Sequence, residues 1–266
     1  MKTRVISAVV LIIAVVACFA ISPITRMLLI LAAAILAIKE MCSALGAMEL
    51  KCAKWVLYVF AVGYAAAIYF SAPRIICDAL FFLAVFAALT AGVTCKDIRG
   101  KGAVATLAII AYPIIPFVLI ARLSIVDNWL PVFALGCIST WLCDAFALFG
   151  GKWFGKNKLA PEVSPNKTIE GTLTGALFSV IGGVILFFVF KSTSFAMSLP
   201  LCMITALVSS SFGQIGDLAA SLIKRMAGIK DYSNLIPGHG GVMDRVDSLL
   251  FSIPTAYFCL TIAGIF

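Results

Sequence analysis

Long apolar stretches, separated by short polar segments, make up most of this chain. An α-helix needs about 20 mostly apolar residues to cross the hydrocarbon core of a bilayer. By that criterion the pattern predicts nine membrane-spanning helices, near residues 5–22, 25–40, 55–71, 75–93, 103–121, 129–150, 171–190, 197–223 and 246–265. Open sheets cannot lie in lipid, and no segment shows the alternating pattern typical of a barrel strand. We therefore expect an all-α, polytopic integral membrane protein.

The composition supports a membrane protein and narrows the kinds of site that the chain can carry. Of 266 residues, 63% are hydrophobic and 12% are charged, whereas about a quarter of the residues in a soluble domain are charged. The nine cysteines form no C-x-x-C pair and lie mostly inside apolar runs. This spacing argues against a thiolate zinc site and against a disulfide framework. We interpret the cysteines as packing residues.

The positions of the basic residues predict how the helices are oriented. With the N-terminus in the cytoplasm, nine spans leave four of the 20 lysines and arginines on the outer side: Arg26, Arg74, Arg122 and Lys191. Because cytoplasmic loops are enriched in Lys and Arg, this asymmetry predicts a cytoplasmic N-terminus. It also explains the net charge of +8 without a nucleic-acid partner. The two long connections, 151–170 and 224–245, then both face the cytoplasm.

Polar residues inside the predicted spans are the first candidates for function. An acidic residue at membrane depth is costly unless it is paired or bound to a cation, and Asp144 lies near the inner end of the sixth span. In the eighth span, four polar residues share one helical face: Ser210, Gln214, Asp217 and Ser221. Hydrogen bonding between helices explains the serines. It does not require a carboxylate, so we interpret Asp217 as functional.

The connection before the last span combines glycines with charged residues. Around His239 the sequence reads P-G-H-G-G, and D-R-V-D follows from Asp244 to Asp247. Glycines in such a turn let the backbone approach a ligand and present N–H groups to phosphate. Asp244 and Asp247 lie one turn apart at the start of a helix, where carboxylates are favoured, and with Asp217 they could hold Mg²⁺. A tight loop with an N-terminal cap, containing a hydrogen-bonded histidine, is the alternative.

The other long loop reads S-P-N-K-T-I-E-G from Ser164 to Gly171. A lysine-bearing loop that opens onto a helix, with Thr168 and Glu170 in its first turns, suits anion binding. We therefore expect Lys167 to contact phosphate. The lysines upstream read as solvated residues of a cytoplasmic loop: Lys152, Lys156 and Lys158.

Taken together, these segments supply carboxylates for a metal, basic groups for phosphates and glycines for close approach. Phosphoryl and nucleotidyl transfer need these groups, because positioning and charge neutralisation provide most of the catalysis. The sequence contains no Walker lysine loop, no Ser-His-Asp elbow and no H-E-x-x-H motif. We divide the chain into N-terminal transmembrane helices, 1–102, and a catalytic transmembrane domain, 103–266, which contains both long loops.

The residues from Ser221 to Asp247 resemble the signature of the CDP-diacylglycerol synthases, also called phosphatidate cytidylyltransferases. The match comprises S-x-I-K-R, K-D, P-G-H-G-G and D-R-V-D at irregular spacings. The block S-P-N-K-T-I-E-G is also similar to one in this family. So is W-x-x-D-A-F at Trp141–Phe146, although the family more often has Tyr at the last position. The resemblance is specific over roughly 139–247, whereas the first hundred residues match only in being hydrophobic helices.

The resemblance implies a Mg²⁺-dependent reaction for phospholipid biosynthesis, in which CTP and phosphatidic acid give CDP-diacylglycerol and pyrophosphate. It implies metal-binding and catalytic roles for Asp217 and Asp244, a catalytic role for Lys224, and Asp247 as a further metal ligand. The substrate-binding residues that it implies are Ser164, Lys167, Thr168, Arg225, Lys230, His239, Gly240, Gly241, Arg245, Asp144 and Ser221. It leaves open a second, monovalent cation such as K⁺, and it suggests a homodimer.

The location of the substrates agrees with the predicted orientation. CTP is cytosolic and the lipid phosphate lies in the inner leaflet, so we expect a multi-pass protein of the cell inner membrane whose site faces the cytoplasm. Two other functions stay open. A related CTP-dependent lipid kinase would transfer the γ-phosphate, and an anion or lipid transporter would use the same basic residues. Transporters often contain internal repeats, and the two halves of this chain show no similar pattern.

Overall fold

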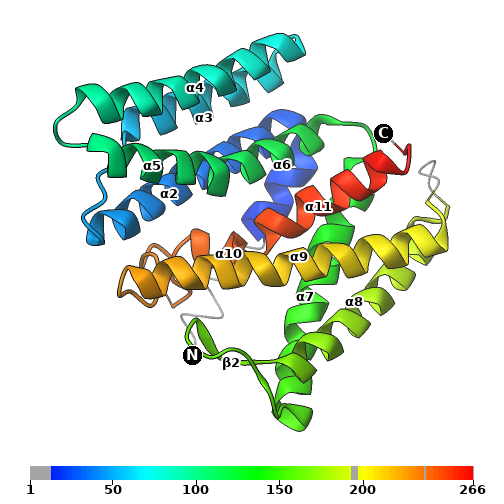
Figure 1. The fold of residues 1–266 in the computed structure, drawn as a ribbon. Coiled ribbons are helices and arrows are strands. Elements are labelled where there is room, and N and C mark those ends of the chain that lie inside the picture. Colours follow the sequence, from blue (N-terminus) through cyan, green and yellow to red (C-terminus); the bar gives the residue numbers. More distant parts are fainter. Residues whose placement is uncertain (1–12, 193–196, 237, 266) are drawn as a thin grey trace. The chain divides into compact units, whose positions relative to one another are not determined.

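Helices form most of the protein in the computed structural model, which describes residues 13–192, 197–236 and 238–265 (Figure 1). Residues 13–21 are helical. The helices that follow are α2 (Pro23–Ala47), α3 (Lys54–Tyr69), α4 (Arg74–Thr94), α5 (Arg99–Ile109), η1 (Ile110–Ile114), α6 (Ile115–Ile125), α7 (Trp129–Phe154), α8 (Ile169–Phe190), α9 (Leu199–Met226), α10 (Met243–Val246) and α11 (Leu249–Ile262). Two short strands, β1 (Lys158–Ala160) and β2 (Ser164–Thr168), lie between α7 and α8.

The helices confirm an all-helical, multi-pass membrane protein. Within the described part of the chain, six helical segments are long and apolar enough to cross a membrane: α2, α4, the continuous segment Arg99–Ile125, α7, α8 and α9. Two of the predicted spans correspond to shorter helices, since α3 has 16 residues and α11 has 14. Residues 1–12 of the first predicted span lie outside the described residues. The number of nine spans and their orientation therefore stay predictions.

The structure groups the helices into two compact units, which we describe separately. Unit 1 contains residues 1–125 and 223–245, and unit 2 contains residues 126–222 and 246–266. The chain passes from one unit to the other after Ile125, within α9 and within α10. The functional division of the chain at residue 102 is a separate prediction.

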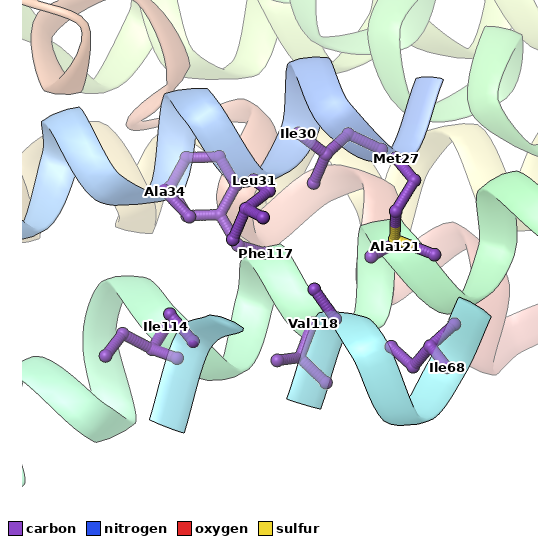
Figure 2. A pocket seen from close by; sticks show the side chains of 11 residues that line it. Met27, Ile30, Leu31, Ala34, Ile68, Ile114, Phe117, Val118 and Ala121 are labelled. Atoms are coloured by element: carbon purple, nitrogen blue, oxygen red, sulfur yellow. The ribbon is translucent and has the colours of Figure 1, made fainter. Parts of the chain in front are cut away.

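In unit 1, α2 packs against α3 and α6, while α4 packs against α3 and α5. Figure 2 shows the apolar side chains where α2 and α6 meet, among them Met27, Ile30, Phe117 and Ala121. They line a pocket of about 20 Å³, which is close to the space that one water molecule needs. Because this pocket is small and its lining is apolar, it is a packing void and offers no room for a substrate.

In unit 2, α7 and α8 lie side by side (Figure 1) and approach each other closely through small residues. A Cβ atom on Gly175 of α8 would lie 2.5 Å from the carbonyl oxygen of Cys143 on α7. Small residues allow such backbone contact, and packing of this kind drives the association of membrane helices. The Oγ atom of Ser210 on α9 donates a 2.8 Å hydrogen bond to Ser179 Oγ on α8, so the third helix is also held by a small polar residue.

The close approach of α7 and α8 predicts a strong effect of one methyl group. Gly175→Ala places a side chain against backbone atoms that cannot move independently, and such overpacking costs about 1–3 kcal/mol. We expect the midpoint of thermal unfolding in detergent to fall by roughly 2–4 °C for each kcal/mol lost. Gly46→Ala is the matched control, because nothing lies within 4 Å of its Cβ position on α2. Equal midpoints for the two variants would contradict this account of the helix pair.

Candidate functional site

The segment predicted as a loop before α8 is an antiparallel β-hairpin that carries Lys167. In the pairing of β1 with β2, Lys158 lies opposite Thr168 and Ala160 lies opposite Ser164. The sequence does not indicate this hairpin, because its strands, of three and five residues, are too short to show a periodic pattern. The loop prediction was therefore wrong in conformation, although the lysine does stand directly before a helix.

Two polar residues fasten the hairpin to the start of α8. Thr168 is the N-cap of α8, and its Oγ1 accepts a 3.1 Å hydrogen bond from the backbone N–H of Gly171. The Glu170 carboxylate accepts hydrogen bonds from the backbone N–H groups of Lys156 and Asn157 and, at 2.7 Å, from Asn157 Nδ2. Thr168 and Glu170 thus hold the hairpin against the start of α8, and contact of Ser164, Lys167 and Thr168 with substrate stays a prediction.

A charged cluster in unit 2, the Asp217 cluster, comprises Asp144, Lys167, Asp217 and Ser221. The ammonium group of Lys167 lies 2.5 Å from Asp217 Oδ2, and the two side chains are 24% and 30% exposed. Ser221 Oγ donates a long, 3.5 Å hydrogen bond to Asp217 Oδ1. Asp144 on α7 is close enough for its charge to interact with those of Lys167 and Asp217. Residues from α7, β2 and α9, far apart in the sequence, are thereby brought together.

The other polar residues on the same face of α9 serve packing. Gln214 Nε2 donates a 2.9 Å hydrogen bond to the Sγ atom of Cys143 on α7, and Ser210 pairs with α8 as described above. A Cβ on Gly216 would lie 2.6 Å from the carbonyl oxygen of Asp247, so the chain before α11 lies directly against α9. The interpretation of this stripe as hydrogen bonding between helices is confirmed for Ser210.

A second charged cluster, the Asp244 cluster, lies in unit 1 and comprises Lys224, Tyr232, Gly241 and Asp244. Lys224 Nζ lies 2.8 Å from Asp244 Oδ1, and the two side chains are only 11% and 3% exposed. Asp244 Oδ2 accepts hydrogen bonds from the backbone N–H groups of Tyr232, at 2.8 Å, and Gly241, at 3.0 Å. Lys224 also lies over the Tyr232 ring, 5.5 Å from its centroid. Both oxygens of this buried carboxylate are therefore engaged.

A tight turn carries the glycines and the histidine of this region. The backbone N–H of His239 donates to the carbonyl oxygen of Ile236 at 2.8 Å, and the N–H of Ile236 donates to that of Gly240 at 2.9 Å. Gly238 and Gly240 have φ angles of 77° and 80°, which L side chains rarely adopt. Pro237, part of the predicted motif, lies outside the described residues. The glycines thus shape the turn, and contact with phosphate remains a prediction.

Glu40 is the residue of this region that the sequence analysis missed. It lies near the end of α2, and it is 5% exposed. Its Oε1 accepts hydrogen bonds from Ser233 Oγ at 2.6 Å and from the N–H of Val242 at 3.0 Å, and its Oε2 accepts from the N–H of Met243 at 2.8 Å. The rule that led to Asp144 and Asp217, an acidic residue within an apolar span, also applied to Glu40.

The remaining candidates lie at the surface or are engaged in local structure. Arg225, Lys230 and Arg245 are exposed, and their contacts with substrate stay predictions. Asp247 is buried, and its Oδ1 accepts hydrogen bonds from the backbone N–H and the hydroxyl of Ser248, just before α11. This geometry is that of a carboxylate near a helix N-terminus, which was the alternative reading of the segment; metal binding by Asp247 stays a prediction.

Comparison with known proteins gives consistent matches. The sequence pattern of the Cytidylyltransferase family matches residues 2–263. Over 130 residues the chain is 41% identical to the phosphatidate cytidylyltransferase of Bacillus subtilis (strain 168), which covers 47% of this chain and 46% of that protein. The phosphatidate cytidylyltransferases of Staphylococcus haemolyticus (strain JCSC1435) and Staphylococcus aureus (strain COL) are 44% and 45% identical over 115 residues, 43% of each chain. The chain thus spans about half the length of the curated relatives it matches.

The buried pair of the Asp244 cluster predicts a large difference between two lysine substitutions. Lys224→Met leaves the buried Asp244 carboxylate without its cation, and removing one partner of a buried pair costs about 3–5 kcal/mol. Lys51→Met breaks the pair with Asp97, whose side chains are 67% and 86% exposed, and such pairs contribute at most about 1 kcal/mol. Thermal unfolding in detergent measures both. Similar losses would show that the Asp244 carboxylate is better solvated than its burial indicates.

Proposed function

The chain belongs to the cytidylyltransferase family, and on that premise we propose that it transfers the CMP moiety of CTP to phosphatidic acid. The products are CDP-diacylglycerol and pyrophosphate. The observation that carries the proposal is that each of two aspartates implied in catalysis lies against a lysine, Asp217 against Lys167 and Asp244 against Lys224. The names of the bacterial relatives support phosphatidate as the acceptor, and the apolar helices suit a lipid substrate.

In this reaction a phosphate oxygen of the lipid attacks the α-phosphorus of CTP. A P–O bond forms there, the bond between the α- and β-phosphates breaks, and pyrophosphate leaves. Because the second pKa of a phosphate monoester is about 6, the nucleophile is already ionised at neutral pH, and the reaction needs no general base. It does need positive charge, since two polyanionic substrates repel each other. Lys167 and Lys224 supply that charge, and their aspartates orient them.

We propose Mg²⁺ as the cofactor, with Asp217 as its main protein ligand. Asp217 Oδ1 receives a long hydrogen bond from Ser221, and the side chain is partly exposed, so this oxygen fits a cation that prefers oxygen ligands. In the described part of the chain, no three His, Cys, Asp or Glu side chains are grouped to hold a metal. This suits Mg²⁺, which proteins bind through one or two carboxylates, substrate phosphates and water. When bound, it would neutralise charge on the phosphates.

Asp244 fits direct metal ligation less well than Asp217 does. Its oxygens already accept hydrogen bonds from Lys224, Tyr232 and Gly241. We therefore propose that Asp244 acts chiefly by holding Lys224, and that it contacts a cation only when it exchanges one of these partners. We also propose that Asp247 is a ligand of Mg²⁺ and that a second, monovalent cation such as K⁺ binds. The family resemblance alone supports these two proposals.

The topology that we propose has nine spans, a cytoplasmic N-terminus and a site that faces the cytoplasm, in a homodimer of the cell inner membrane. The distribution of lysines and arginines supports the orientation. The substrates support it too, since CTP is cytosolic.

The proposed orientation makes Cys95, an exposed cysteine directly after α4, accessible from the cytoplasm. We expect a membrane-impermeant maleimide to label Cys95 in inverted inner-membrane vesicles and to leave it unlabelled in intact spheroplasts, because the reagent cannot cross the bilayer. Cys95→Ser identifies the labelled site. Labelling of Cys95 in intact spheroplasts would reverse the proposed orientation.

The proposed catalytic roles predict that Asp217→Asn and Asp244→Asn lower CTP-dependent formation of CDP-diacylglycerol by roughly a hundredfold or more, the range seen when an electrostatic group of a transfer site is removed. Purified protein with labelled CTP and phosphatidic acid provides the assay, and size-exclusion profiles show whether each variant is folded. Asp97→Asn removes an exposed carboxylate and should keep the parent rate.

The products of this assay separate the competing functions. A cytidylyltransferase gives CDP-lipid and pyrophosphate, whereas a lipid kinase gives phosphorylated lipid and CDP. A transporter would move an anion or lipid across sealed vesicles without turnover of CTP. Near-normal rates in both folded aspartate variants would contradict the proposed site.

A further inference from the structure

A buried carboxylate from the N-terminal half of the chain holds the glycine-containing segment that carries Asp244. Glu40 comes from α2, and its hydrogen-bond donors all lie in the segment from Ser233 to Met243. The donors are one hydroxyl and two backbone N–H groups, which are neutral. Hydrogen bonds from neutral donors to a buried carboxylate are short and strong, and all these residues belong to unit 1.

The hydrogen bonds to Glu40 and Asp244 alternate along the same two stretches of backbone. In the first stretch, the N–H of Tyr232 donates to Asp244 and the hydroxyl of the next residue, Ser233, donates to Glu40. In the second, the N–H of Gly241 donates to Asp244, and the following two N–H groups donate to Glu40. The two carboxylates therefore accept hydrogen bonds from adjacent residues of the same main chain.

The space that the Glu40 carboxylate occupies, rather than the backbone conformation of Gly241 itself, requires a glycine at position 241. Its φ angle lies outside the left-handed region, but a Cβ atom would lie 2.5 Å from Oε1 of Glu40 and 2.7 Å from its Cδ. Any side chain at this position therefore displaces Glu40. The glycine of the family-like motif and the glutamate of α2, about 200 residues apart in the chain, form one steric unit.

We propose that Glu40 is a positioning residue, which sets the main chain of residues 241–243 and thereby the place of Asp244 and Lys224. The proposal rests on the role of Asp244 in the proposed reaction. Glu40 contacts neither substrate. It acts through the backbone N–H groups of Val242 and Met243, which donate hydrogen bonds to its carboxylate. This gives α2 a part in catalysis beyond anchoring the protein in the membrane.

The direct test replaces the carboxylate with an isosteric amide. Glu40→Gln puts an N–H₂ group where one of two acceptor oxygens stood, so an N–H of Val242 or Met243 loses its acceptor. We expect kcat for CDP-diacylglycerol formation to fall by roughly 10–100-fold, since a displacement of about 1 Å at a reacting site has that effect. The KM for CTP should change little. Glu49→Gln, which changes an exposed carboxylate just after α2, should keep the parent kcat.

A rescue experiment tests whether Glu40 and Gly241 form one steric unit. Gly241→Ala should lose activity as Glu40→Gln does, because the methyl group displaces the carboxylate. Glu40→Asp shortens the side chain and makes room for that methyl group. The double variant Glu40→Asp with Gly241→Ala should therefore be at least about fivefold more active than Gly241→Ala alone, a coupling expected only for groups in contact. No recovery in the double variant would count against the contact.

Hydrogen exchange of the backbone separates failure of this inference from failure of the proposed function. In Glu40→Gln, exchange should rise at residues 241–243 and stay at the parent level in α3 (Lys54–Tyr69), whether or not the protein uses CTP. If exchange in Glu40→Gln becomes faster throughout unit 1 and the thermal stability of the protein falls to a matching extent, Glu40 is merely structural. That result would overturn the proposal. So would parent values of kcat and exchange in Glu40→Gln. Absence of CDP-diacylglycerol formation by the folded parent protein would instead overturn the proposed function, and near-parent activity of a folded Asp244→Asn would overturn the role of Asp244 alone.

Discussion

A carboxylate inside an apolar chain has to find its donors within the protein, because the surroundings provide little water to solvate the charge. Asp217, Asp244 and Glu40 meet this requirement in different ways. Asp217 lies against one lysine and stays partly exposed, whereas Asp244 combines a lysine with two backbone N–H groups. Glu40 uses a hydroxyl and two N–H groups. These partners of the carboxylates lie in the two long polar segments, 151–170 and 224–245, whose structure follows from the requirement to supply hydrogen bonds and positive charge.

The different environments of the three carboxylates suit the proposed reaction between two polyanions. The more exposed aspartate can exchange a partner at low cost and is suited to a cation. Asp244, which is more buried, cannot exchange a partner at low cost, and it is suited to keeping Lys224 in one place. Among the described residues, the hydrogen-bond partners of Glu40 include no cation, and two of its three donors are backbone N–H groups. Burial thus separates groups that can take part in binding from groups that hold others in position.

Hydropathy predicted the positions of most helices well, because apolar runs separated by short polar segments mark where a helix can lie in lipid. It failed where other forces decide. The β1–β2 hairpin is held by Glu170 and Asn157, and no periodic pattern announces such contacts. The roles of Ser210 and Gln214 could be foreseen only as a class, since their partners on α8 and α7 are a matter of helix packing. Glu40 is the last residue of the predicted span 25–40, and only its contacts with Ser233, Val242 and Met243 distinguish it from a solvated residue at a helix end.

The hairpin before α8 limits how the length of this chain can vary. The pairing of Lys158 with Thr168 and of Ala160 with Ser164, together with the cap that Thr168 forms on α8, joins the end of β2 directly to the helix. The register shifts between these two pairs, so residues 165–167 of β2 lie opposite the single residue 159 of β1, and an inserted residue there would change where Lys167 lies relative to α8. The turn at 161–163 lies outside the strand pairing and is closed by a backbone hydrogen bond from the N–H of Val163 to the carbonyl oxygen of Ala160. Insertions and deletions in related sequences should therefore accumulate at the tip of the hairpin, while its base keeps a constant length.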